Sequence, residues 1–324
     1  MKKALVWLLG AAIGTASAQP WPARNVSLLV ASAPGAGVDN IARILAERLG
    51  TRIGYAVVVE NRPGASGMIA AAQAAKAPPN GHSLFLFPET VVIAPHVLSR
   101  QAATVDVIHD FVPVILATST VQVLAVNAKL PVHDVRELVA LAKSEPGLAY
   151  SAGQMGSPMH VLAEQLKKAA GIQLTFVPYN GVAQSVAAAL GGQVNVIWVP
   201  VSGQLQHFRS GALRPLAQSG PRRFALLPEV PSMAEVGYPG IEHLSLVGIA
   251  APSGTPEAIV DTINRELNAV LAEQDVRNRI LASANTPEGG PPSGLAEALR
   301  EHDRRYRRLA AELKIRADEK IGKP

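Results

Sequence analysis

The sequence predicts an α/β fold of two units with a cleft between them. Its 324 residues exceed what one hydrophobic core usually holds, so two units are expected. Hydrophobic residues make up 48% of the chain and charged residues 17%, which is enough apolar surface for two dry cores. Short β-type runs alternate with amphipathic helical runs, and this alternation is typical of open parallel sheets.

A strand–helix–strand–helix–strand order opens the first unit. We expect the strands at residues 26–30, 55–60 and 83–87. A helix of small side chains is expected at 68–77, between the second strand and the third. The segment between the first two strands carries apolar residues on one helical face, at Ile41, Ile44, Leu45 and Leu49.

Two valine-rich runs, at 112–117 and 121–126, are interpreted as two strands that cross between the units. The second unit resumes the alternation. Asp134 and Glu137 have capping-box spacing at the start of its first helix. Further helices are expected from Ser157, Val182 and Ser202, and strands at 148–152, 173–177, 194–199 and 213–219.

A connection marked by Pro221, Pro228 and Pro231 leads back toward the first unit. A strand at 246–250 follows it, and then three helices at 255–271, 275–283 and 293–316. These helices need a sheet to pack on, and the first unit is the expected host. The predicted domains are therefore 19–126 plus 227–324, and 127–226, joined by a two-strand hinge.

The first eighteen residues predict a secretory signal peptide. Lys2 and Lys3 precede an apolar stretch at 4–16, and Ala16-Ser17-Ala18 is an A-x-A cleavage site. The apolar run is shorter than the roughly 18–20 residues of a membrane span; the alternative is a buried N-terminal helix. Cleavage after Ala18 would export a soluble product, most simply to a bacterial periplasm.

Charge and cysteine content narrow the function classes. The chain has no cysteine, which excludes thiol catalysis and thiolate metal sites and fits an oxidising compartment. The formal charge of +5 becomes +3 once the two signal-peptide lysines are removed. Such a mildly basic surface attracts anions but is weak evidence for nucleic-acid binding. No cofactor or metal site is expected.

Two glycine-containing loops are the main candidates for ligand binding. Each follows a strand and opens a helix, where free N–H groups and the helix dipole attract an anion. The alternative for each is a well-made turn and helix cap. One carboxylate held by each loop would fix both ends of a small di-acid. The loop residues are Ala33, Pro34, Gly35, Ala36, Gly37 and Asp39 in the first unit, and Gln154, Gly156, Ser157 and Pro158 in the second.

Two further segments also follow strands. Tyr179 and Asn180 offer hydrogen-bond donors to a ligand. Glu89 follows the third strand and either binds a ligand amine or hydroxyl or is simply solvated. His160 lies in the first turn of its helix, where packing is favoured over ligand contact.

At these loops the sequence resembles the substrate-binding proteins of tripartite tricarboxylate transporters, the Bug-type receptors. The order and spacing of the motifs along nearly the whole chain after the signal peptide make the resemblance specific. The motifs are APG at 33–35 with Asp39, VVENRPGA at 58–65, AKAPPNG at 75–81, HDF at 109–111, GSPMH at 156–160, VPY at 177–179, LPEVP at 227–231 and APSGTP at 251–256.

The resemblance implies a periplasmic receptor of the type II binding-protein fold that closes by a hinge. It implies a small carboxylated ligand, held by the backbone of the two loops, and delivery to a membrane permease of two other subunits. The chain departs from the family pattern at Val199, where an aspartate is frequent, and at Met155 and Leu246. The first two make the pocket more apolar, which favours a di- or tricarboxylate or an aromatic acid over an amino acid.

Three rival functions remain for comparison. An enzyme is disfavoured because the third glycine of a dinucleotide fingerprint is replaced by Asn40, and because the eight histidines show no HExxH motif. A nucleic-acid or membrane-surface protein is suggested by the arginines of the last helix, but a solvated helix face with i,i+4 ion pairs explains them. The third is a ligand-sensing partner of a membrane sensor kinase. A monomer is the default state.

Overall fold

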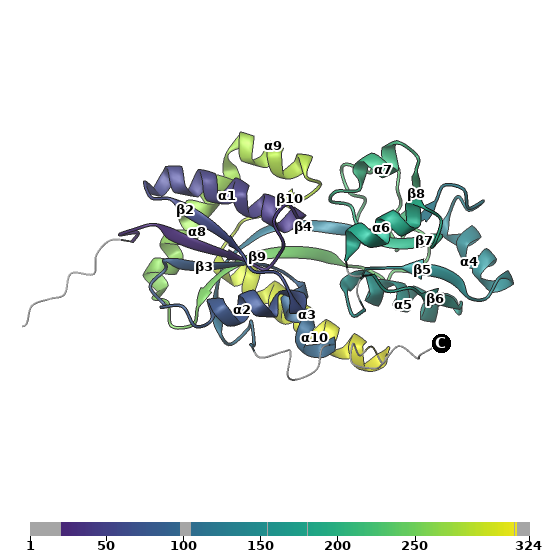
Figure 1. Cartoon of the computed structure of the whole chain (residues 1–324), viewed down its shortest axis with the longest axis horizontal. Coiled ribbons are helices and arrows are strands. Elements are labelled where there is room, and N and C mark those ends of the chain that lie inside the picture. The colour runs from purple at the N-terminus through teal and green to yellow at the C-terminus, as the bar shows by residue number, and fades with distance from the viewer. Residues whose placement is uncertain (1–20, 98–104, 154, 180, 314, 316–324) are drawn as a thin grey trace, which may run out of the picture.

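The computed structural model describes residues 21–97, 105–153, 155–179, 181–313 and 315. The expected signal peptide and two candidate ligand residues, Gln154 and Asn180, lie outside the described residues. The strands form a continuous mixed sheet in the order β2-β1-β3-β9-β4-β7-β5-β6, with β8 and β10 also paired to β4. Helices cover both faces of this sheet, and the molecule has two lobes (Figure 1).

The first lobe contains the β-α-β-α-β unit that the sequence predicts. Its strands are β1 (Val26–Val30), β2 (Val57–Asn61), β3 (Ser83–Pro88), β9 (Leu244–Pro252) and the short β10 (Thr286–Pro287). β1 pairs in parallel with β2 and β3, whereas β9 runs antiparallel to β3. The parallel strands therefore bring their carboxyl ends to one edge, where the loops that enter α1 and α2 begin.

Two layers of helices enclose this lobe. On one face, α1 (Gly37–Ile53), α8 (Glu257–Ala272) and α9 (Gln274–Ala282) pack on the sheet; on the other lie the 3-10 turn η1 (Ala65–Gly67), α2 (Met68–Ala74), α3 (Thr90–Val97) and α10 (Pro292–Glu312) (Figure 1). Buried Ile41, Ile263 and Ile280 join the first layer in one core. The expectation that the C-terminal helices pack on the first unit is therefore confirmed.

The second lobe repeats the layered arrangement. Its strands are β5 (Leu148–Ser151), β6 (Leu174–Phe176), β7 (Val196–Pro200) and β8 (Leu213–Gln218), and its helices are α4 (Val135–Ser144), α5 (Pro158–Ala170), α6 (Val182–Leu190) and α7 (Leu205–Arg209). Leu138 and Leu162 fill a core on one face of the sheet, and Val186 and Phe208 fill a core on the other. The chain between β8 and β9 packs here as well, because Met233 and Ile241 belong to the first of these cores.

One strand of 17 residues, β4 (Phe111–Asn127), connects the lobes. The prediction of two crossing strands within this segment was wrong: the two valine-rich runs are consecutive halves of β4, and the second long strand between the lobes is β9 (Figure 1). Two of the polar residues between the runs, Ser119 and Thr120, lie within the strand and find acceptors for their hydroxyls. Ser119 Oγ donates to Glu288, and Thr120 Oγ1 donates to the Ala284 carbonyl at 2.8 Å.

Candidate functional site

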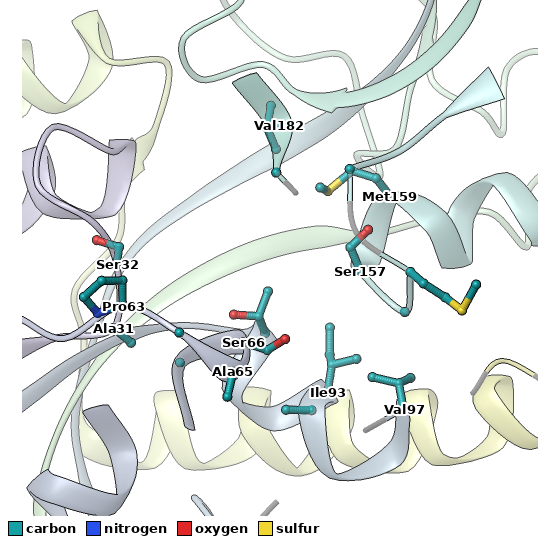
Figure 2. A pocket seen from close by; sticks show the side chains of 18 of the residues that line it. Ala31, Ser32, Pro63, Ala65, Ser66, Ile93, Val97, Ser157, Met159 and Val182 are labelled. Atoms are coloured by element: carbon teal, nitrogen blue, oxygen red, sulfur yellow. The ribbon is translucent and has the colours of Figure 1, made fainter. Parts of the chain in front are cut away.

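A pocket of about 390 Å³ lies between the two lobes. Figure 2 shows side chains of the first lobe, such as Ser32, Pro63 and Ser66, opposite Ser157, Met159 and Val182 of the second. Helix α3 contributes Thr90, Ile93, Ala94 and Val97 to the wall. The lobes approach closely on both sides of it. A Cβ placed on Gly156 would lie 2.8 Å from Val97, and one placed on Gly37 would lie 3.9 Å from Ser202 Oγ.

The loop between β2 and α2 supplies backbone donors to this pocket. Four consecutive residues have positive φ: Gly64 (120°), Ala65 (46°), Ser66 (54°) and Gly67 (91°). Gly67 donates its N–H to the Gly64 carbonyl at 2.9 Å. The N–H groups of Ala65 and Ser66 have no acceptor among the described residues, and both residues line the pocket. This loop therefore presents two free donors to a ligand.

The opposite wall is the loop that leads into α5. Ser157 caps the helix: its Oγ accepts the His160 N–H at 3.2 Å and donates to the Ala152 carbonyl at 2.8 Å. Pro158 occupies the first helical position, where it loses no hydrogen bond. The backbone N–H of Ser157 has no acceptor within the described part of the chain. It is a third free donor at the pocket.

Two more helices begin at the pocket. Thr90 starts α3, and Gly181 and Val182 start α6, and all three residues line the cavity. Together with α5, three helices therefore begin at one small volume, where the partial positive charge of each helix N-terminus favours an anion. Among the described lining residues, no side chain is charged. The site is thus electropositive through its backbone alone and suits an anion.

The remaining surface of the pocket is apolar. Ile93 and Val97 project from α3 into the space between the lobes, and Met159 and Val182 face them from the second lobe (Figure 2). The pocket therefore combines backbone donors with an uncharged apolar surface.

Three of the candidate residues line the pocket: Ala33, Gly156 and Ser157. Residues Pro34, Gly35, Ala36 and Gly37 form the entry to α1. Asp39 is buried and organises that entry, since its carboxylate accepts from the Gly35 N–H at 2.8 Å and from Asn61 Nδ2 at 2.9 Å. Its pKa is lowered: burial opposes ionisation, but Arg43 and these donors outweigh it.

Tyr179 and Val199 also lie outside the lining residues. The backbone N–H of Tyr179 donates to the Gly153 carbonyl at 3.2 Å, so Tyr179 stabilises the pocket loop without lining the pocket. Val199 is fully buried in β7, opposite Val123 of β4.

Glu89 belongs to a buried cluster and not to the pocket lining. Its carboxylate lies 3.0 Å from His243 Nε2, next to the start of β9, and 3.1 Å from His302 Nδ1 on α10. Tyr306 Oη lies 3.2 Å from His243 Nδ1. Burial alone would raise the pKa of Glu89, but the two histidines lower it to about 2. Burial also lowers the pKa of His243. The Glu89 carboxylate is therefore ionised, and His243 and His302 already contact it.

Several pocket residues were not among the sequence candidates. These include Pro63 to Gly67, the α3 residues Thr90, Ile93, Ala94 and Val97, and Ser32, Met159 and Val182. Met155, which was expected to make the pocket more apolar, does line it. A signal for the first group existed: Gly64 and Gly67 follow a parallel strand next to β1, at the same sheet edge as the first candidate loop. For α3 the sequence offered no helical signal.

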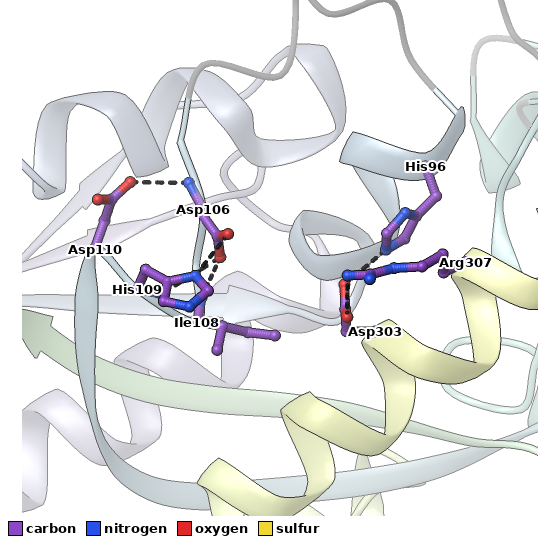
Figure 3. A network of polar contacts seen from close by, with 7 residues as sticks. All are labelled: His96, Asp106, Ile108, His109, Asp110, Asp303 and Arg307. Atoms are coloured by element: carbon purple, nitrogen blue, oxygen red, sulfur yellow. Dashed lines mark hydrogen bonds and ion pairs between the residues drawn. The ribbon is translucent and has the colours of Figure 1, made fainter.

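A second hollow, of about 530 Å³, lies beside α3 and α10. Its charged groups pair with one another (Figure 3). Asp303 accepts from His96 Nε2 and from Arg307, each at 2.8 Å, and Asp106 pairs with His109 at 2.8 Å. The acidic groups Asp106 and Asp303 therefore already face cationic or hydrogen-bonding partners, which distinguishes this hollow from the interlobe pocket, whose described lining carries no charged side chain. In the described ranges, no group of three acidic or histidine side chains is arranged to hold a metal ion.

None of the helices in the described residues is long and apolar enough to cross a membrane. The fold and the site together define a two-lobed α/β binding protein with an anion-binding pocket between its lobes.

Comparison with known proteins agrees with this class. Residues 41–285 match the model of the tripartite tricarboxylate transporter family receptor. A UPF0065 protein from the tcbD–tcbE intergenic region of a Pseudomonas species is 33% identical over 301 residues, covering 92% of this chain and 89% of that protein. Protein BugT of Bordetella pertussis is 33% identical over 290 residues, covering 87% and 89%. The chain therefore belongs to the family of tripartite tricarboxylate transporter receptors.

Solved structures are similar over nearly the whole chain. The R. palustris protein Rpa4515, determined with adipate, has a TM-score of 0.82 and 30% identity, covering 91% of this chain and 99% of that one. MatC from Rhodopseudomonas palustris, determined with bound malate, has a TM-score of 0.78 and 27% identity, covering 89% and 99%. The predicted fold, a periplasmic binding protein fold with a cleft between two lobes, is confirmed.

Proposed function

We propose that the protein is a periplasmic solute receptor that captures a small carboxylated molecule between its lobes. The observation that carries the proposal is a pocket lined by free backbone N–H groups, three helix N-termini and no charged side chain among the described lining residues. On closure, the two walls would each hold a carboxylate, with donors at Ala65 and Ser66 on one side and at Ser157 on the other. The receptor would then deliver its ligand to a two-subunit membrane permease.

We propose a di- or tricarboxylate or an aromatic acid as the ligand, in preference to an amino acid. Adipate and malate in the similar structures support a di-acid. The described lining residues provide no carboxylate to pair with an ammonium group, and Glu89 is occupied by His243 and His302. Ile93, Val97 and Met159 instead favour a hydrophobic body between the acidic groups.

We further propose that the protein binds its ligand without transforming it. The hydroxyl-bearing side chains of the described lining are Ser32, Ser66, Thr90 and Ser157, and no histidine or carboxylate of that lining is there to activate them. The nearest histidine in sequence, His160, accepts a hydrogen bond from the Gly156 backbone.

The export signal and the domain limits stay proposals. We propose cleavage after Ala18 and a monomeric mature receptor. The first domain boundary is kept at residue 126. Because Met233 and Ile241 pack into the second lobe, we place the second boundary near residue 243 instead of 227. Closure would then move residues 127–243 against the rest of the chain.

Thermal unfolding of the mature protein with a panel of acids tests this function. The panel includes adipate, malate, citrate, glutamate, nicotinate and an aromatic di-acid. A ligand at about 100 times its Kd stabilises the folded state by roughly 2.7 kcal/mol, so the midpoint should rise by several degrees with di-acids and not with glutamate. No shift with any acid, and no acid released from the denatured protein, would refute carboxylate capture. Uptake in vesicles with the two permease subunits tests delivery.

A further inference from the structure

The loop between β5 and α5 forms the second lobe's half of the pocket, and a buried histidine fixes its conformation. Gly156 lines the pocket with its backbone, and its N–H points away to donate to His160 Nδ1 at 3.1 Å. His160 is 6% exposed and is not among the lining residues. It therefore touches the pocket wall from behind.

The imidazole of His160 is held in one orientation. Its ring lies 4.2 Å from that of Phe176 and stacks within 9° of the Tyr150 ring, at a centroid distance of 6.5 Å. Burial lowers the pKa of His160 to about 4, so the ring is neutral near neutral pH. The Gly156 N–H requires an unprotonated Nδ1, which places the ring proton on Nε2, toward Glu164 at 3.8 Å.

The acceptor at Nδ1 determines which groups face the ligand. Gly156 has φ +77°, a conformation that favours glycine, and Val97 of the first lobe lies directly against it. With the Gly156 N–H bound to His160, the next N–H along the chain, that of Ser157, is left without an acceptor among the described residues. Without Nδ1, the buried Gly156 N–H would lose its partner and the peptide would reorient to find one.

We propose that His160 is a positioning residue: by accepting the Gly156 N–H, it sets the orientation of the Ser157 N–H that binds the ligand. This inference rests on the proposed carboxylate capture. It assigns His160 a role that is neither direct ligand contact nor packing of the ring.

Two substitutions at this position separate hydrogen bonding from packing. In His160→Asn, the side-chain Oδ1 takes the place of Nδ1 and still accepts the Gly156 N–H, although the ring volume is lost. In His160→Leu, much of the volume remains but the acceptor is lost. We expect His160→Leu to weaken adipate binding about 10-fold or more, and His160→Asn to stay within about 3-fold of the wild type. A packing role predicts the opposite order.

Hydrogen exchange of the Gly156 amide tests the same inference without a ligand. The amide should be protected in the wild type and in His160→Asn and should exchange faster in His160→Leu. The Leu and Asn substitutions of His207, a half-buried residue of α7 outside the pocket lining, serve as matched controls and should leave both readouts unchanged. Unchanged exchange in His160→Leu would overturn the positioning role. If adipate and the other acids fail to bind the wild type, the proposed function falls while the exchange result still stands.

Discussion

Gly156→Ala tests whether ligand capture depends on close contact between the lobes. The new Cβ would lie 2.8 Å from both Cβ and Cγ2 of Val97, whereas ordinary contacts begin near 3.4 Å. Gly156 must therefore retreat from α3 by about 0.6 Å. Because Val97 and Gly156 belong to different lobes, the retreat separates the two walls of the pocket.

The magnitude follows from the cost of overpacking. An extra methyl in a tight site costs about 1–3 kcal/mol, and here the cost falls on the arrangement in which Val97 and Gly156 are in contact between the lobes, which we expect to be the one that binds ligand. Affinity should drop by about 5- to 150-fold. The left-handed φ of +77° adds about 1 kcal/mol to the cost of folding, independent of closure. Gly192→Ala is the matched control, because Gly192 also has φ +77° but no atom within 4 Å of the new Cβ.

Calorimetric titration with adipate and urea unfolding provide the two readouts. Both alanine variants should lose unfolding free energy, but only Gly156→Ala should lose affinity. Adding Val97→Gly to Gly156→Ala should recover part of the lost affinity, since it removes the three close atoms of Val97 together with its apolar contact to the ligand, whereas Val97→Ala leaves the Cβ in place. Equal adipate affinity in Gly156→Ala and Gly192→Ala would refute the coupling of this contact to binding.

Three further outcomes are expected. First, the free energy of unfolding should fall as the pH drops from 6.5 to about 4, because His160 is protonated at a higher pH in the unfolded chain than in the folded one. In His160→Asn, the dependence of this free energy on pH, measured by urea unfolding, should be weaker. Second, the ionised Glu89 stabilises the fold above pH 4.5, and this contribution disappears as the pH falls toward 2; Glu89→Gln should flatten that part of the profile, and an unchanged profile would contradict its ionised state. Third, Asp134→Ala removes the cap that accepts the Glu137 N–H at 2.7 Å and should cost about 1 kcal/mol of stability, with adipate affinity unchanged in titration.

Local patterns were sufficient to predict most of the helices and strands. The face formed by Ile41, Ile44 and Leu45 identifies α1, because its period matches a helix packed on one side. The capping pair at Asp134 and Glu137 likewise marks the start of α4. Such features depend on neighbours within a few residues, which a sequence displays directly.

Helix α3 was missed because its sequence argues against a helix. Thr90 and the next three residues are all β-branched, and Pro95 lies inside the helix. Its stability comes from tertiary packing: Val91 joins the core with α2 and α10, and Ile93 and Val97 pack near the end of α10. Four pocket residues were lost with this helix, since their position depends on those contacts.

The parts of the site that depend on sheet topology could be predicted from the sequence. The parts that depend on pairing between distant residues could not. Ala33, Gly156 and Ser157 lie at the carboxyl ends of parallel strands, so a ligand site near them was foreseeable. Glu89 lies at the same kind of position, but His243 and His302 bind it from residues more than 150 positions away. No local sequence pattern predicts a contact between residues so far apart in the chain.

The continuity of β4 also limits how the molecule moves and folds. Its pairing with β9 runs to Val121, and its pairing with β7 begins at Gln122, so no unpaired residue separates the two ladders. The lobes are joined by a ribbon of paired strands without a break between the two ladders, so we expect closure to occur as bending and twisting of that ribbon. Neither lobe has a complete sheet without this shared strand, so heat should melt both in a single cooperative transition.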